Sequence, residues 1–167
     1  WPVGATSRHQ PALSDDRFIP GLARLADAVH AHGARMVVQM CHHGKTAGID
    51  IVEGREQIIP SVPVPDDEMS FDHLTMDEIM KLAGTTGGKA PTRRAATLDE
   101  LAWVVDQFAD AAERVQNAGM DAVEVHAAHG YLISTFLSPK YNHRTDEYGG
   151  SVEHRARLLC DVVRAIR

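Results

Sequence analysis

The 167-residue sequence has little of what marks out several specialised classes of protein. Its two cysteines, Cys41 and Cys160, are too few for a disulfide framework, so we expect both thiols to be reduced. No run approaches the roughly 18 apolar residues of a membrane span, and no basic-then-apolar leader is recognisable. A net charge of −6 gives no general attraction to nucleic acid. We therefore expect a cytoplasmic protein without membrane or nucleic-acid partners.

What is present is the composition of an ordinary globular protein. Hydrophobic residues make up 44% of the chain and charged residues 24%, which is enough apolar material for a core. The length allows one domain at most. The first residue is Trp1 rather than Met, and the chain stops at Arg167 inside an expected helix. We therefore expect this sequence to be a piece of a longer protein.

Hydrophobic periodicity predicts the order helix, strand, helix, strand, helix. The first helix covers residues 14–33, and the apolar run 34–40 forms a strand after it. A capping box made by Thr97 and Glu100 opens the second helix, Gly119 ends it, and strand 121–126 follows. Ser151 begins the last helix. The residues expected to face the core are Phe18, Leu22, Leu25, Ala26 and Val29, then Leu101, Val104, Val105, Phe108, Ala111, Ala112 and Val115, and finally Ala156, Leu159, Val162, Val163 and Ile166.

Between the first strand and the second helix, residues 46–96 are interpreted as an irregular excursion. The segment is rich in proline and glycine and lacks a sustained period, apart from a short helix expected around residues 76–82. Its basic residues Lys89, Arg93 and Arg94 are expected at a solvated, mobile tip rather than at a phosphate site.

Short strands that alternate with helices imply parallel pairing, because each helix returns the chain across the sheet. This leaves a doubly wound sheet and a (β/α)8 barrel as the two candidate architectures. Both place their chemistry at the carboxyl ends of the strands. A complete barrel takes about 250 residues, so a barrel interpretation makes this chain an incomplete one.

Titratable residues gather at both of these strand ends. The first end reads QMCHHGK at residues 39–45, and the second reads HAAHGY at residues 126–131. His126, His129 and Tyr131 could together hold a carbonyl-like oxygen and deliver a proton. The alternative is structural, with His126 as a core residue whose hydrogen bonds are satisfied and Tyr131 as a buried aromatic.

A metal site is a second hypothesis, with Cys41, His42 or His43, His126 and His129 as ligands. The two histidines of the second strand end are three residues apart and separated by alanines. The helical signature of zinc peptidases needs histidines four apart with a glutamate between them, so the spacing does not favour this hypothesis.

Arg144, Asp146 and Glu147 form a charged group in the polar segment before the last helix. The two carboxylates could serve as general acids or bases. The simpler interpretation, which we favour, is an ion-pair network that pins this loop over the strand end.

Two long segments carry a resemblance to a known family. The first is residues 118–167, which read AGMDAVEVHAAHGYLISTFLSPKYNHRTDEYGGSVEHRARLLCDVVRAIR. This segment is similar to the signature region of the old yellow enzyme family of FMN-dependent oxidoreductases. Residues 18–45 are similar to the family's second helix and third strand, ending in a Gln-x-x-His-x-Gly-basic pattern that starts at Gln39. The chain departs from the family at Cys41, where an aromatic is usual, and at Lys45, where arginine is usual.

This resemblance implies a partial FMN-binding (β/α)8 barrel, α/β in class, that covers about strands three and four in one incomplete domain, residues 1–167. By resemblance, Gln39 contacts the pyrimidine side of the flavin, His126 and His129 bind the substrate oxygen, and Tyr131 donates the proton. The implied activity is hydride transfer from reduced FMN to an activated alkene such as an enone, or to a nitro compound, with NADH or NADPH as reductant.

The same resemblance leaves homo-oligomerisation open. It also implies that the segment alone is inactive, because most of the flavin site would lie outside it. Two alternatives stand beside it: a stand-alone, non-catalytic α/β binding module, and a metal-dependent barrel hydrolase.

Overall fold

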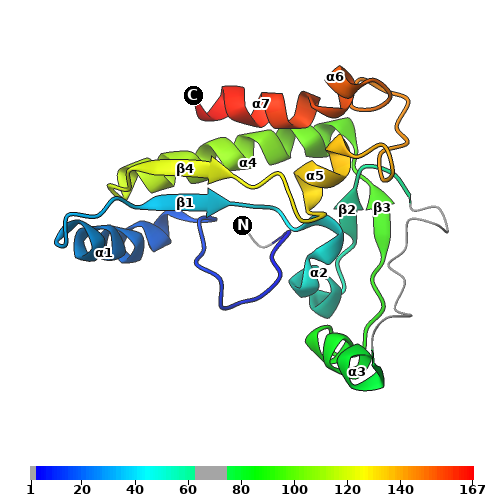
Figure 1. The fold of residues 1–167 in the computed structure, drawn as a ribbon, viewed down its shortest axis with the longest axis horizontal. Helices are drawn as coiled ribbons and strands as arrows, with labels where there is room; N and C mark the ends of the chain where they lie inside the picture. The colour runs from blue at the N-terminus through cyan, green and yellow to red at the C-terminus, as the bar shows by residue number, and fades with distance from the viewer. Residues whose placement is uncertain (1–2, 63–74) are drawn as a thin grey trace.

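The computed structural model describes residues 3–62 and 75–167, in which helices alternate with short strands (Figure 1). The elements in chain order are η1 (Asp16–Phe18), α1 (Ile19–His30), β1 (Val37–Met40), η2 (Gly44–Thr46), α2 (Gly48–Glu53), β2 (Gln57–Ile59), α3 (Met76–Thr85), β3 (Arg93–Ala95), α4 (Leu98–Asn117), β4 (Ala122–Val125), α5 (Leu132–Leu137), α6 (Val152–Arg155) and α7 (Arg157–Ile166). The expected order of helix, strand, helix, strand, helix is confirmed by α1, β1, α4, β4 and α7. None of the helices in these described ranges is long and apolar enough to cross a bilayer.

Strands β1 and β4 pair in parallel, which confirms the pairing inferred from their alternation with helices. Their register runs from Val37 opposite Ala122 to Met40 opposite Val125. Both hydrophobic clusters of the core include Val38 and Val123, so α1, α4 and α7 pack on the same face of this sheet. In Figure 1, α4 runs along the strand pair and α7 packs beyond it.

The other face of the β1–β4 sheet is open. It carries Val37, Gln39, Ala122 and Glu124, which are all exposed, Val37 to 56%. Residues on one face of a strand alternate with those on the other, so this face is distinct from the one under the helices. A (β/α)8 barrel turns one face of each strand to its helices and the other to its interior, and the two faces seen here fit that arrangement.

Helix α4 begins as its sequence predicts. The Thr97 hydroxyl accepts a hydrogen bond from the Glu100 amide, and the Glu100 carboxylate accepts one from the Thr97 amide, which completes the capping box. At the other end Gly119 adopts the left-handed conformation with φ +74°, as expected of a helix stop. Five of the seven residues expected on the inner face are buried: Leu101, Val104, Phe108, Ala111 and Val115.

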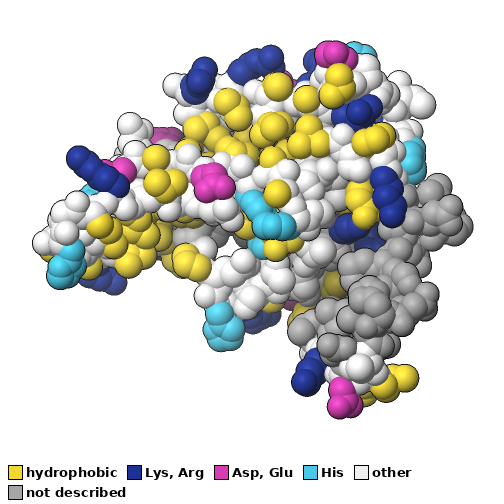
Figure 2. All heavy atoms as spheres, viewed as in Figure 1, with side chains coloured by type: hydrophobic (Ala, Val, Ile, Leu, Met, Phe, Trp, Pro, Cys, Tyr) yellow, Lys and Arg dark blue, Asp and Glu magenta, His cyan; other side chains and the backbone are white. Residues whose placement is uncertain are grey.

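Two of the expected core faces need correction. Ser151 caps the short helix α6, and α7 starts only at Arg157. In α7, Leu158 and Val162 are buried against the core, whereas Val163, expected there, is 37% exposed. Figure 2 shows apolar side chains gathered along α7 and toward β4, the strand nearest to it in this view. In α1, Leu25 is 44% exposed because it faces the cavity beside β1.

The excursion is more regular than its composition predicts. It contains α2 and α3, which confirms the short helix expected near residue 76, and a second parallel sheet made by β2 and β3. Arg93 and Arg94 lie in β3, so the expectation of a mobile tip was wrong for both. Arg94 donates to the carboxylates of Glu56, at 2.9 Å, and Glu100, at 2.5 and 2.7 Å. The part of the excursion at residues 63–74 lies outside the described residues.

Candidate functional site

The two strand ends singled out in the sequence lie side by side. The backbone amide of His126 donates to the carbonyl of Met40 at 2.9 Å, continuing the ladder by one residue. The amide of Leu132 then donates to the carbonyl of His42 at 3.0 Å. These bonds hold the segment after β4 against the segment after β1, so the structure brings residues 39–45 and 126–131 together.

His126, His129 and Tyr131 form one cluster at the end of β4. The Nε2 of His126 lies 3.0 Å from the Nδ1 of His129, and the ring centroids of His126 and Tyr131 are 5.0 Å apart in an edge-to-face arrangement. His126 is buried, Tyr131 is half-buried and His129 is exposed. The cluster therefore runs from the protein interior to the surface.

The contact between the two imidazoles limits what the cluster can do as it stands. Two ring nitrogens at 3.0 Å share one proton, so one ring donates to the other. A ligand oxygen that accepts from both rings has to replace this contact. His129 also has φ +58° and is the one residue other than glycine with positive φ in the described chain. Backbone strain of this kind in a residue other than glycine is typical of functional sites.

His43 reaches the same cluster from the end of β1. Its ring centroid lies 4.4 Å from that of Tyr131, and its Nδ1 lies 2.8 Å from the carbonyl oxygen of Gly4. A carbonyl only accepts, so Nδ1 carries the proton and Nε2 is left to accept from the Gln10 amide at 3.3 Å. Burial lowers the pKa of His43, which keeps the ring neutral.

His42 is the histidine of the pattern that starts at Gln39, and its contacts are those of a residue with a structural role. Its Nδ1 accepts from the amide of Gly44 at 3.0 Å, and the ring packs directly on Gly4, where a Cβ would lie 2.6 Å from it. Complete burial lowers its pKa to about 3. Burial likewise raises the pKa of the Cys41 thiol.

The proposed metal ligands do not converge. Within residues 3–62 and 75–167, no three His, Cys, Asp or Glu side chains form a group that could hold a metal ion. The hypothesis of a metal-dependent hydrolase has no support in this part of the chain.

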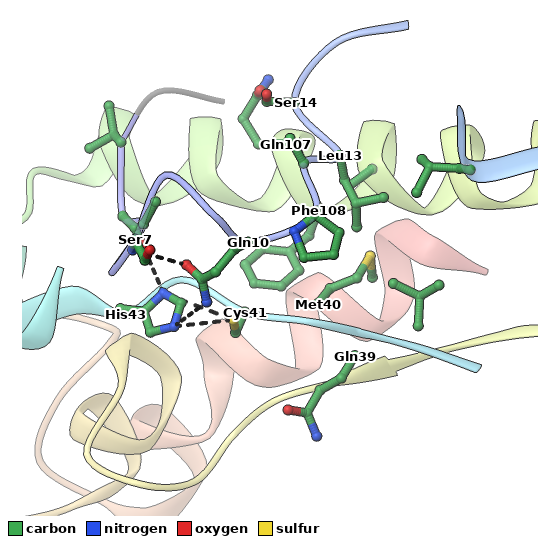
Figure 3. Close-up of a pocket in the computed structure, with 18 of the residues that line it drawn as sticks. Ser7, Gln10, Leu13, Ser14, Gln39, Met40, Cys41, His43, Gln107 and Phe108 are labelled. Carbon is green, nitrogen blue, oxygen red and sulfur yellow. Dashed lines mark hydrogen bonds between the residues drawn. The ribbon is translucent and has the colours of Figure 1, made fainter. Parts of the chain in front are cut away.

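Gln39 lies on the open face of the sheet. Its side-chain amide donates to the carboxylate of Glu124 at 2.9 Å, and the two residues are direct partners in the register of β1 and β4. Figure 3 shows Gln39 on the opposite side of β1 from Met40. Glu124 was not predicted as a site residue from the sequence. Strand alternation was the available signal, because Glu124 is two residues before His126 and so shares its face.

A cavity of about 560 Å³ adjoins the site (Figure 3). It lies between the segment that precedes α1, strand β1 and α4, and it shares Gln39, Cys41 and His43 with the strand end. Its lining includes Leu22, Phe108 and Ala111 of the core clusters, so the cavity lies on the helix side of β1, and the Gln39 carboxamide lies on the opposite, open face. A carboxamide donates and accepts side by side, which suits the pyrimidine edge of a flavin. The position of Gln39 therefore fits the role that the resemblance gives it.

Lys45 stands where the family usually has arginine. Its ammonium lies 3.7 Å from the ring centroid of Tyr141, and its side chain runs beneath Gly130 in the turn that carries His129. Lys45 thus packs under the second strand end as a cation on an aromatic face.

The charged group after α5 is a structural network, as favoured above. The Arg144 guanidinium binds the Asp146 carboxylate and donates to the carbonyls of Pro60, at 3.0 Å, and Ala96, at 2.7 Å, just after β2 and β3. This arginine lowers the pKa of Asp146. Glu147 is exposed and pairs with Arg157 at 3.1 Å. Neither carboxylate reaches the histidine cluster through these contacts, so the acid or base role has no support.

Comparisons with known proteins agree with the geometry. The sequence model of the NADH:flavin oxidoreductase / NADH oxidase family matches residues 2–167. The NADH oxidase of Thermoanaerobacter brockii is 37% identical over 167 residues, which is 100% of this chain and 22% of that protein. The NADPH dehydrogenase of Bacillus pumilus is 36% identical over 165 residues, which is 99% of this chain and 41% of that protein. The chain therefore spans less than half the length of these relatives.

Among solved structures, the old yellow enzyme from Pichia sp. AKU4542 is similar with a TM-score of 0.78 and 31% identity, over 99% of this chain and 40% of that one. That protein is a (β/α)8 barrel, and the described helices and strands correspond to part of it. The family match over almost every residue and the shared fold lead to one conclusion: this chain belongs to the NADH:flavin oxidoreductase / NADH oxidase family, the FMN-dependent oxidoreductases of the old yellow enzyme type.

Proposed function

We propose that this chain supplies the substrate-binding and proton-donating side of a flavin-dependent ene reductase that uses NADH or NADPH. In this proposal β1 and β4 are the third and fourth strands of the barrel. The observation that carries it is the cluster of His126, His129 and Tyr131 at the end of β4, hydrogen-bonded through the backbone to the strand that bears Gln39. Membership of the family supports the same assignment.

Gln39 is the residue that would hold FMN in this part of the chain. The chemistry that the bound flavin supplies is hydride transfer to the substrate. Because the Gln39 amide donates to Glu124, its oxygen and its second N–H remain to meet the pyrimidine edge. The open face of the sheet, where Val37 and Ala122 flank this amide, provides a surface for the flavin.

His126 and His129 would bind the oxygen of an enone or nitro compound. An N–H from each ring draws electron density toward that oxygen and makes the β-carbon a better hydride acceptor. Tyr131 then transfers its phenolic proton to the α-carbon, so that one C–H bond forms at each carbon as the double bond is lost. Water returns a proton to the phenolate. General acids of this kind typically contribute about 10²–10⁴ in rate.

The isolated 167-residue chain is proposed to be inactive. It offers one side of a flavin site on the face of a two-stranded sheet, and it spans 41% of the NADPH dehydrogenase relative. A single Gln contact of about 0.5–1.5 kcal/mol does not retain a cofactor. We expect the full-length protein to purify with the absorbance of FMN, and this chain alone to purify without it.

Binding of a substrate-like ligand tests the proposal. In the full-length protein, His126→Ala and His129→Ala should each weaken the binding of a phenol or enone by about 5- to 100-fold, the equivalent of one lost polar partner. Reduction of the flavin by NADH or NADPH should keep its rate. His32→Ala, which removes an exposed imidazole after α1, is the matched control. Unchanged ligand affinity in both cluster variants would overturn the proposed roles.

A further inference from the structure

We infer that His43 is a positioning residue that fixes the phenol of Tyr131 for proton donation, an inference that rests on the proposed function. It concerns a feature of this chain, because the pattern that starts at Gln39 specifies His42 and Gly44 and leaves position 43 open. The closest aromatic neighbour of Tyr131 is His43, with ring centroids 4.4 Å apart and an interplanar angle of 55°. The ring of His126 approaches Tyr131 at 5.0 Å. The phenol ring therefore contacts one imidazole from each strand end.

His43 is held more firmly than a residue that only fills space. Its backbone amide donates to the carbonyl of Gly4 at 2.9 Å, and its Nδ1 donates to the same oxygen at 2.8 Å. On the other side of the ring, Nε2 accepts from Gln10 and lies 3.6 Å from the sulfur of Cys41. Hydrogen bonds at both nitrogens determine the tautomer and the rotation of the ring. The side chain is 4% exposed.

The anchor behind His43 is itself buried and charged. The Gly4 amide donates to the Asp50 carboxylate at 2.9 Å, and the Arg55 guanidinium donates to the same carboxylate at 2.8 and 3.0 Å. Asp50 is fully buried, so its position is set by this pairing. A continuous series of contacts thus runs from Arg55 through Asp50, Gly4 and His43 to the ring of Tyr131.

This arrangement matters because a proton donor needs direction as well as acidity. Tyr131 is the residue that precedes α5, and its side chain has no capping hydrogen bond to that helix. The ring contacts with His43 and His126 restrict its rotation. Misplacing a catalytic group by about 1 Å can cost about 10²-fold in rate. Loss of the His43 ring should therefore slow the step that uses the Tyr131 proton.

A double-mutant cycle in the full-length protein tests the inference. His43→Asn removes the ring but keeps a donor for Gly4, and His43→Phe keeps a ring against Tyr131 and loses the donor. Each is made alone and together with Tyr131→Phe, with His32→Asn as the matched surface control. Stopped-flow absorbance measures flavin reduction by the nicotinamide and flavin reoxidation by the enone separately, and retained FMN and thermal unfolding report on the fold.

We expect His43→Asn to slow reoxidation by about 10- to 100-fold, His43→Phe to recover part of that loss, and both to leave flavin reduction unchanged. In the Tyr131→Phe background, His43→Asn should add less than twofold, because the group that it positions is gone. Equal losses in both backgrounds, or a normal reoxidation rate in His43→Asn, would overturn the inference. If His43→Asn fails to fold, the test uses His43→Phe alone, and its reoxidation rates with and without Tyr131→Phe are compared in the same way. If Tyr131→Phe itself reoxidises at the parental rate, the proposed function fails instead.

Discussion

The two strand ends of this site differ in how they are built. At the end of β1, His42 and His43 are buried, and burial lowers the pKa of both. The Nδ1 of His42 and both ring nitrogens of His43 have backbone or side-chain partners. At the end of β4, His129 is exposed and has strained backbone geometry, and its Nδ1 contacts the ring of His126. Two histidine-rich sequences of similar length thus give a scaffold at one end and an adaptable group at the other.

The difference follows from what covers each end. Residues 3–10 fold over the end of β1 and bring Gly4 and Gln10 onto His42 and His43. At the other end, the turn through His129 and Gly130 rests on Lys45 and leaves the imidazole of His129 in solvent. Substitutions at the first end should therefore reduce stability, and substitutions at the second end should reduce ligand binding with little loss of stability.

The largest expected effect is a loss of stability at acid pH that arises from the end of β1. The pKa of His42 is about 3 in the folded chain, against 6.5 for an unburied histidine, so the unfolded state binds the proton more readily between these values. The free energy of unfolding should then be intact above about pH 6.5 and fall by up to about 1.4 kcal/mol per pH unit as the pH drops toward 3. Thermal unfolding of the full-length protein at pH 7, 6, 5 and 4 measures this, and His42→Asn should flatten the slope. An unchanged slope in that variant, matching the surface control His32→Asn, would contradict the assignment.

A second substitution at the first end should have the next largest effect. Gly4 has φ +82°, and an added Cβ would lie 2.6 Å from the ring of His42, so Gly4→Ala should destabilise the protein by about 2–4 kcal/mol. Gly54 has a similar φ of +75° with nothing within 4 Å of its Cβ position, so Gly54→Ala should cost only the strain, about 1 kcal/mol. Chemical or thermal unfolding compares the two, and equal losses would show that the packing of Gly4 on His42 is unimportant.

The smallest effect on stability is expected at the end of β4. Here glycine should be the more stable residue, whereas at Gly4 its replacement by alanine should destabilise the protein. His129→Gly and His129→Ala both remove the imidazole, but only glycine adopts φ +58° without strain. The glycine variant should be more stable than the alanine variant by about 1 kcal/mol, whereas both should bind an enone equally weakly. Thermal unfolding and ligand titration test the two statements independently. A more stable alanine variant would mean that the left-handed turn is absent from the protein.

Much of the fold follows from local sequence signals. The capping box at Thr97 and Glu100, the stop at Gly119 and the parallel pairing of the strands all rest on short-range patterns that the structure confirms. Because parallel strands align their carboxyl ends, the pairing of β1 with β4 also brings the two strand ends together.

The features that the sequence did not reveal depend on contacts between distant segments. Arg94 lies in β3 because this segment pairs with β2, and its side chain binds the carboxylates of Glu56 and Glu100. Both strands are too short for a hydrophobic period to identify them. The role inferred for His43 depends on Gly4, which is 39 residues away in the chain. Periodicity carries no information about either contact.

The central claim is that Tyr131 at the adaptable end donates the proton. Tyr131→Phe keeps the ring that contacts His43 and His126 and removes only the hydroxyl. Stopped-flow measurement of the two half-reactions in the full-length protein should show flavin reduction by NADH or NADPH at the parental rate and alkene reduction slowed by about 10²–10⁴. Equal slowing of both half-reactions, or of neither, would contradict the account and leave these residues with a structural role.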